Sequence, residues 1–272
     1  MVQLGHSGGT IEVSMLKHLT LNSLRSYRKK YSAKYGELII ATDTGSSWRK
    51  AVFPYYKANR KKDKDNSALD WDSIFVALEE IRNDLEQYFP YRIIRVQGTE
   101  GDDVIGAMCQ EFGSGLPGSD PILILSGDKD FKQLQKYMNV DQYDPVRNKK
   151  LVENDPEDYL LEHIIKGDRS DGVPNILSAD NCLVVGERQG TMTAKRLANF
   201  KECAKTGKWD DPTAERNFKR NEQMIDLLHT PAQLKIEIRQ QYNDQAGKDR
   251  SKIFNYLMQN RMKHLMEYIS EF

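Results

Sequence analysis

The segment PILILSGDKDF, residues 121–131, decides how the rest of the sequence is interpreted. Its first half is a continuous apolar run from Ile122 to Leu125, which is typical of a parallel strand covered on both faces. Asp128 and Asp130 follow the strand directly. Because ligands of open α/β sheets gather at the carboxyl ends of parallel strands, we expect both carboxylates in a functional site. Two neighbouring carboxylates repel each other unless cations neutralise them, and oxygen-only ligands suit Mg²⁺ or Mn²⁺.

A simpler interpretation of these residues is a strand followed by an ordinary acidic turn. Asp128 or Asp130 would then cap a helix over 129–136 by accepting hydrogen bonds from its first backbone N–H groups. The segment alone leaves both interpretations open.

Two further predicted strands also end beside acids. The segment ELIIAT, residues 37–42, leads directly to Asp43, and a short strand over 91–96 precedes Glu100 and Asp103. The spacing of three places Glu100 and Asp103 on one side of the first turn of a helix that runs to about residue 112, near the positive end of its dipole. Each acid could be a simple N-cap, but three acidic strand ends favour one shared cluster.

Positive charge and aromatic rings are concentrated in residues 46–64. Coulomb attraction to phosphates and stacking on unpaired bases would suit this segment to nucleic acid, whereas a solvated charged loop is the bland alternative. The basic residues are Arg49, Lys50, Lys57, Arg60, Lys61, Lys62 and Lys64, and the aromatic residues are Trp48, Phe53, Tyr55 and Tyr56.

Strands and helices alternate through the first part of the chain, and the last third is predicted to be helical. This order predicts an α/β fold with a central, mostly parallel sheet flanked by helices and a C-terminal helical subdomain, divided as 1–155 and 156–272. Helices are expected at about 13–31, 70–89, 156–165, 193–205, 212–228, 231–242 and 249–272, with a β-hairpin at 140–152 and an irregular insertion at 177–190.

Bulk composition narrows the possible classes of protein. The 272 residues suffice for one large or two small domains, and 40 basic residues balance 40 acidic ones, so overall charge indicates no partner. Without an 18-residue apolar run or a signal-peptide core, we expect no membrane association and a cytoplasmic protein. The three cysteines lack C-x-x-C spacing and no two histidines have metal-pair spacing, so we expect no zinc site and structural or surface histidines.

Taken together, these motifs resemble those of the FEN-type 5′ nucleases over residues 13–272. Each motif is weak alone, but their order and spacing are highly specific. The resemblance implies a PIN-like nuclease core, a basic arch over about 46–68 and a helix-turn-helix-like element that grips duplex DNA. The motifs are ATD at 41–43, YYKANRKK at 55–62, EGDD at 100–103, SGDKDF at 126–131, GDRSDGVPN at 167–175, GERQGTMTAKR at 186–196 and ISEF at 269–272.

The resemblance also implies roles for individual residues. Two Mg²⁺ ions, replaceable by Mn²⁺, would support phosphodiester hydrolysis, while Lys57 and Arg60 would neutralise and grip the scissile phosphate at the foot of the arch. The implied ligands are Asp43, Glu100, Asp103 and Asp128 for the first metal, and Asp130, Asp168 and Asp171 for the second. Implied DNA-binding residues are Tyr56, Lys61, Lys62, Lys195 and Arg196, with Val173 and Asn175 orienting backbone amides.

The implied activity is that of a 5′-to-3′ exonuclease and flap endonuclease that removes RNA primers and 5′ flaps in bacteriophage DNA replication. Its expected partners are branched or flapped DNA and RNA–DNA hybrids, bound by a monomer in the host-cell cytoplasm. The preference between RNA and DNA stays open because phosphates and duplex shape are read more than bases. The C-terminal segment with Tyr268, Ile269 and Phe272 is an expected contact for a single-strand-binding protein or a sliding clamp; docking on its own core is the alternative.

One departure from the family pattern affects the expected activity. Relatives carry another metal-ligand aspartate at the end of a first strand, before the segment equivalent to Val13, and this sequence lacks it, so we expect Met1 to be an internal or truncated start. Two alternatives follow. One is a nucleic-acid-binding protein with impaired catalysis. The other, less favoured, is a phosphatase of the haloacid dehalogenase type, for which the Asp-Lys-Asp at 128–130 comes too late in the chain.

Overall fold

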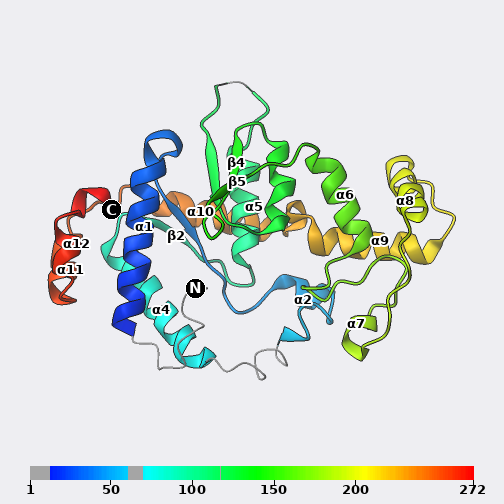
Figure 1. Ribbon diagram of the computed structural model, residues 1–272, viewed down its shortest axis with the longest axis horizontal. Coiled ribbons are helices and arrows are strands. Elements are labelled where there is room, and N and C mark those ends of the chain that lie inside the picture. The colour runs from blue at the N-terminus through cyan, green and yellow to red at the C-terminus, as the bar shows by residue number, and fades with distance from the viewer. Residues whose placement is uncertain (1–12, 61–69, 117) are drawn as a thin grey trace. The chain divides into compact units, whose positions relative to one another are not determined.

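The computed structural model of the chain describes residues 13–60, 70–116 and 118–272. The chain divides into two compact units, each assembled from separate stretches of sequence. Figure 1 labels the helices and strands. The first unit takes Met1–Thr42, Lys62–Ile94 and Gln240–Phe272, and the second takes Asp43–Lys61 and Arg95–Arg239. Within the described ranges, we find no helix with the length and apolar character needed to cross a membrane.

In its described residues, the first unit contains two long helices, one pair of strands and a helical C-terminal end. The strands β1 (Ile39–Ala41) and β2 (Arg92–Ile94) run parallel, with Ile39 opposite Arg92. The helices are α1 (Val13–Tyr35), α4 (Trp71–Tyr88), α11 (Ile253–Gln259) and α12 (Lys263–Met266), followed by the 3-10 turn η4 (Ile269–Glu271).

The core of the first unit includes the C-terminal residue of the sequence. Helix α4 begins at its N-cap Asp70, which accepts from the Ser73 N–H, and its buried residues recur with helical spacing. Phe272 is fully buried, with its ring centroid 5.5 Å from that of Phe89. The C-terminal segment therefore docks on its own core through Phe272, while Tyr268 stays 40% exposed.

The second unit carries a three-stranded sheet and most of the helices. Strand β3 (Ile122–Leu125) pairs parallel with β4 (Val140–Asp144), and β4 pairs antiparallel with β5 (Lys149–Leu151). The helices are α2 (Trp48–Val52), α5 (Gly101–Phe112), α6 (Pro156–Lys166), α7 (Cys182–Val185), α8 (Ala194–Thr206) and α9 (Pro212–Ile225), with the 3-10 segments η2 (Lys129–Lys136) and η3 (Leu227–His229); the boundary between the units falls within α10 (Ala232–Asp244).

The predicted α/β class and helical C-terminal region are confirmed, with differences in detail. The described strands form two hydrogen-bonded sheets, of two and three strands, where one central sheet was expected. The hairpin over 140–152 is confirmed, and the helix predicted at 129–136 is a 3-10 helix. The helix expected from 249 to the end is instead broken into short pieces, because Arg261 adopts a left-handed conformation (φ 56°) that a continuous helix excludes.

Candidate active site

Lys57 joins carboxylates from two segments of the second unit that are far apart in sequence. Its Nζ lies 2.5 Å from Glu100 Oε1 and 3.6 Å from Asp171 Oδ2. Arg60 Nη2 contacts the other Asp171 oxygen at 2.8 Å. The Lys57 side chain is only 10% exposed, whereas that of Arg60 is 59% exposed. Lys57 is therefore held in place among acids, and Arg60 extends toward solvent.

A glycine permits the backbone contact beneath these side chains. The Lys57 N–H donates to the Asp171 carbonyl at 2.8 Å. Gly172 has φ +74°, and a Cβ there would lie 2.8 Å from the Tyr55 carbonyl oxygen and 3.3 Å from the Lys57 nitrogen. A side chain at this position would separate the turn 167–175 from the residues at the foot of the predicted arch.

The start of α5 brings two further acids to the cluster. The Gly101 N–H donates to Asp43 Oδ1 at 2.6 Å, which places Asp43 beside the first turn of α5. Burial is the main cause that raises the pKa of Asp102 to about 7. The charges of Asp128, Glu100 and Asp130 act in the same direction, and the charge of Lys57 acts against them. Asp102 thus faces acids from three other positions, although the sequence interpretation had selected Asp103 as the ligand from this turn.

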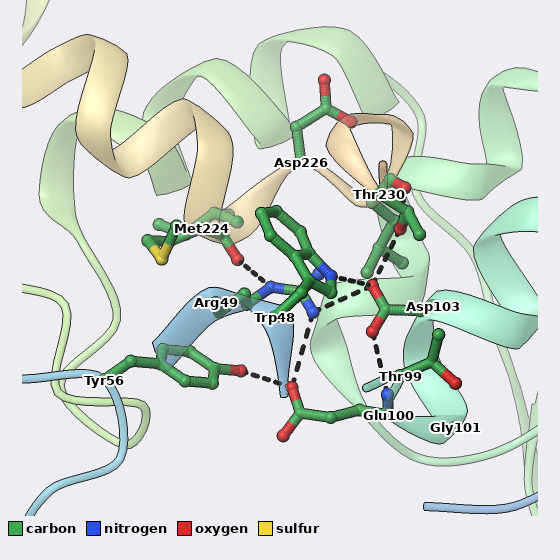
Figure 2. A network of polar contacts seen from close by, with 12 residues as sticks. Trp48, Arg49, Tyr56, Thr99, Glu100, Gly101, Asp103, Met224, Asp226 and Thr230 are labelled. Carbon is green, nitrogen blue, oxygen red and sulfur yellow. Dashed lines mark hydrogen bonds and ion pairs between the residues drawn. The ribbon is translucent and has the colours of Figure 1, made fainter. Parts of the chain in front are cut away.

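Asp103 is fully buried instead, and Figure 2 shows its polar contacts. Its Oδ1 accepts hydrogen bonds from Trp48 Nε1 (3.1 Å) and Thr230 Oγ1 (2.8 Å) and pairs with Arg49 Nη1 (2.9 Å). Its Oδ2 accepts from the Glu100 N–H at 2.9 Å. With both oxygens engaged and no exposed surface, Asp103 is a structural anchor of the cluster, which argues against the expected ligand role.

The helical period of α5 does not distinguish the two aspartates. Asp103 is buried with Ala107, one turn later, but the half-buried Asp102 likewise precedes the buried Gly106 by one turn. The sequence interpretation used the spacing from Glu100, whereas the partners of each carboxylate in the fold separate the two.

Tyr56 is placed differently from the prediction. It is 3% exposed, and its hydroxyl donates to Glu100 Oε2 (2.8 Å) and Asp171 Oδ2 (3.0 Å). Burial and the charge of Asp171 raise the pKa of its phenol. The ring packs in a core with Phe53 and Val173, so it cannot stack on a DNA base as expected.

A second group of side chains that could hold a metal ion consists of Asp130, His163 and Asp168. Their potential ligand atoms lie within 4.8 Å of one another. Asp168 Oδ2 lies 3.0 Å from His163 Nε2 and 2.7 Å from Lys129 Nζ. Although burial alone would raise it, hydrogen bonds from His163, Lys129 and Ser170 hold the pKa of Asp168 well below its usual range. Burial raises the pKa of Asp130 to about 6, against the opposing charge of His163.

Asp128 takes the capping role that the sequence left open, and it keeps acceptor capacity for a ligand. Its Oδ1 accepts from the Asp130 N–H at 3.0 Å, so it caps η2, while the side chain remains exposed beside Asp102. A carboxylate has more acceptor capacity than this cap uses, so capping does not exclude ligation.

The turn 167–175 begins where α6 ends. Helix α6 starts at the N-cap Asp155, followed by Pro156, and ends at Gly167, which has φ +70°. Val173 and Asn175 are 1% and 7% exposed. Asn175 Nδ2 donates to the Gly190 carbonyl at 2.8 Å, so both side chains hold the turn from inside.

Of the remaining predicted DNA-binding residues, Lys195 and Arg196 are exposed in the first turn of α8. The N-cap Thr193 accepts from the Arg196 N–H, which leaves the start of this helix ordered and facing solvent. Lys61 and Lys62 lie outside the described residues.

Comparison with protein families matches both parts of the chain. A family described as the 5′-3′ exonuclease, N-terminal resolvase-like domain, matches residues 5–162. A second, described as T4 RNase H, C terminal, matches residues 154–272.

Individual relatives agree with these matches. The chain is 31% identical to ribonuclease H of Enterobacteria phage T4 over 273 residues, which cover 96% of this chain and 88% of that protein. It is 29% identical over 197 residues to DNA polymerase I of Caldicellulosiruptor bescii, covering 67% of this chain and 21% of that protein.

Solved structures show the same fold. The bacteriophage T5 D15 protein, co-crystallised with metal ions, matches with a TM-score of 0.57 and 19% identity over 83% of this chain and 91% of that chain. The T5 D15 flap endonuclease, in a pseudo-enzyme–product complex with DNA and metal ions, matches with a TM-score of 0.60 and 17% identity over 89% of this chain and 93% of that chain.

Proposed function

The chain belongs to the 5′-3′ exonuclease family, with a C-terminal part of the T4 ribonuclease H type, and we propose that it is a divalent-metal-dependent 5′-to-3′ exonuclease and flap endonuclease of bacteriophage DNA replication. The observation that carries the proposal is the convergence of acids on Lys57. Carboxylates from four places in the sequence meet in one region of the second unit. They come from Asp43, the start of α5, the end of β3 and the turn 167–175. Family membership leaves the phosphatase alternative without support.

The donor set fits hard divalent cations, because carboxylate oxygens dominate it. The first metal would be held by Asp43, by acids at the start of α5 and by the acid that follows β3, with Asp102 taking the place of Asp103. The second metal would be held by acids that follow β3 and α6. Two Mg²⁺ or Mn²⁺ ions would lower the pKa of bound water and stabilise charge on the attacking and leaving oxygens. The first group is Asp43, Glu100, Asp102 and Asp128, and the second is Asp130, Asp168 and Asp171.

Lys57 and Arg60 would act on the phosphate itself. Lys57 is pre-positioned by Glu100 and Asp171, so stabilising a developing negative charge would require little reorganisation. The exposed guanidinium of Arg60 can release Asp171 and bind a phosphate in its place.

Flapped DNA and RNA–DNA hybrids are the proposed substrates. The turn 167–175 and the exposed start of α8, with Lys195 and Arg196, would hold duplex phosphates away from the cutting site. The two family models overlap at residues 154–162, which supports the proposed division into domains 1–155 and 156–272, whereas the two compact units follow a different division. For a single-strand-binding protein or clamp, Tyr268 is the accessible contact, since Phe272 is buried.

The competing proposal is a DNA-binding protein that does not cut, because Glu100 and Asp171 are already neutralised by Lys57 and Arg60. A 5′-labelled flap substrate and an RNA–DNA hybrid, each incubated with the full chain and Mg²⁺, distinguish the two. We expect short 5′ products that disappear with EDTA and with Asp130→Asn, while Glu86→Gln, at an exposed position of α4, cleaves normally. Binding without cleavage at every Mg²⁺ and Mn²⁺ concentration would establish the competing proposal.

A further inference from the structure

His163 is a buried histidine at the end of α6 that the nuclease proposal leaves without a role. The residue is 9% exposed. Its Nε2 lies 3.0 Å from Asp168 Oδ2, and its Nδ1 lies 3.6 Å from Asp130 Oδ1. The imidazole therefore stands between two of the acids proposed for the second metal.

The contacts of Asp168 determine which nitrogen of His163 carries hydrogen. Asp168 Oδ2 also contacts Lys129 Nζ at 2.7 Å, and its Oδ1 accepts from the Ser170 N–H at 2.8 Å. A carboxylate with these donors is ionised and can only accept, so in the neutral form, the form of imidazole that binds metals, Nε2 donates to it. Nδ1 then keeps its lone pair, which faces Asp130.

The lone pair of Nδ1 and the facing carboxylate oxygen are left without partners. Among the described residues, neither His163 Nδ1 nor Asp130 Oδ1 has a hydrogen-bond partner, and both atoms are buried. Their separation of 3.6 Å exceeds hydrogen-bond length. It is close to the separation of about 3 Å between two adjacent ligands that each bind one ion at about 2.1 Å. Two buried acceptors arranged in this way are suited to a cation between them.

We propose that His163 Nδ1 and Asp130 Oδ1 ligate one divalent ion, while Asp168 orients the imidazole by accepting its Nε2–H. A carboxylate that fixes a metal-binding histidine through its second nitrogen is a recurrent arrangement. The inference rests on the proposed function, because the ion is the second metal of the nuclease. It changes the chemistry of that site: a nitrogen ligand favours Mn²⁺ or Co²⁺ over Mg²⁺, which prefers oxygen.

Mn²⁺ bound to the full chain tests this assignment by electron paramagnetic resonance. With ¹⁵N-labelled histidine, we expect nitrogen hyperfine coupling on the bound Mn²⁺ in the original chain. The coupling should persist in His229→Gln, since His229 contacts Asp226 in another part of the second unit, and disappear in His163→Gln. Calorimetry should show Mn²⁺ affinity at the second site falling about 10-fold or more in His163→Gln, with a smaller change for Mg²⁺.

The labelled original chain gives the decisive result even if His163→Gln fails to fold. Bound Mn²⁺ without nitrogen coupling would overturn the inference, as would equal Mn²⁺ affinity in a folded His163→Gln chain. If the chain cleaves flaps with Mg²⁺ in either of these cases, the nuclease proposal stands and only the role of His163 is wrong. If no divalent ion binds to the chain, both proposals are wrong.

Discussion

The guanidinium of Arg49 and the carboxylate of Asp103 form an ion pair of 2.9 Å in which the side chains are 2% and 0% exposed (Figure 2). Arg49 Nε also donates to the Met224 carbonyl at 2.9 Å. The pair thus joins three elements of the second unit: α2, α5 and the end of α9. The acids that precede Asp103 in the sequence, at the start of α5, face the proposed metal site.

Removing the carboxylate of Asp103 should primarily lower the free energy of unfolding. Asp103→Ala removes the closer counter-ion of the buried Arg49 and leaves it only the 3.4 Å contact with Glu100 Oε2. Breaking a buried pair in this way typically destabilises a protein by about 3–5 kcal/mol. Urea unfolding of the metal-free chain measures the loss. Glu215→Gln, which removes an exposed i,i+4 pair with Lys219, should cost less than about 1 kcal/mol. Equal effects of the two substitutions would contradict the structural role of Asp103.

Asp102→Asn should show the opposite pattern. Its carboxylate is crowded by Asp128 and Glu100, so neutralising it removes repulsion and should leave metal-free stability unchanged or increased. Flap cleavage should fall by about 10-fold or more, because one proposed metal ligand is lost. If Asp102→Asn cleaves normally while folded, the assignment of this residue to the first metal is wrong.

Strand ends were easier to predict from sequence than side-chain directions. The apolar run before Asp128 predicted β3, and an acid at the end of each strand predicted a cluster; both follow from local pattern. Asp102 and His163 were missed because their roles depend on burial and on partners elsewhere in the chain. Tyr56 was misjudged for the same reason: aromatic rings beside lysines suit both DNA stacking and a core, and only the fold distinguishes the two.

Lys57→Met tests the proposed stabilisation of charge at the phosphate. Methionine keeps most of the buried length of the side chain but removes the ammonium group that lies between Glu100 and Asp171. Single-turnover cleavage should slow by about 100- to 1000-fold, with little change in substrate affinity. Lys149→Met, at an exposed position of β5, serves as the matched control and should cleave normally. A defect that appears only in affinity would make Lys57 a binding residue.

Lys195→Ala and Arg196→Ala should weaken DNA binding in a salt-dependent way. Each removed phosphate contact should reduce the slope of log affinity against log salt by about 0.9 for duplex DNA. Lys205→Ala, in the last turn of the same helix, removes an equal charge and should leave the slope unchanged. Fluorescence anisotropy with a flap substrate between low and moderate salt gives the slopes. An equal change for all three variants would indicate a diffuse electrostatic effect without a defined contact.

His18 and His264 give the first unit a pH dependence that their separation in sequence conceals. Their ring centroids lie 4.3 Å apart, between α1 and α12. Burial and the neighbouring His264 lower the pKa of His18 below 6.5. The unfolded chain therefore binds more protons at this residue as pH falls through about 6.5, so the free energy of unfolding decreases toward acid.

Substituting His18 should remove that acid-side loss. Between pH 7.5 and 5.5, His18→Gln should lose less stability than the original chain, and His264→Gln should fall between them, because burial is the larger cause of the shift. His229 contributes to stability with the opposite pH dependence. Its hydrogen bond with Asp226 raises its pKa in the folded chain, so its stabilising contribution is full below about pH 6.5. That contribution, which His229→Gln removes, is lost as the pH rises through the pKa of His229 in the folded chain. Urea unfolding across this range measures all three variants. Parallel pH profiles for His18→Gln and the original chain would show that His18 is not the titrating group.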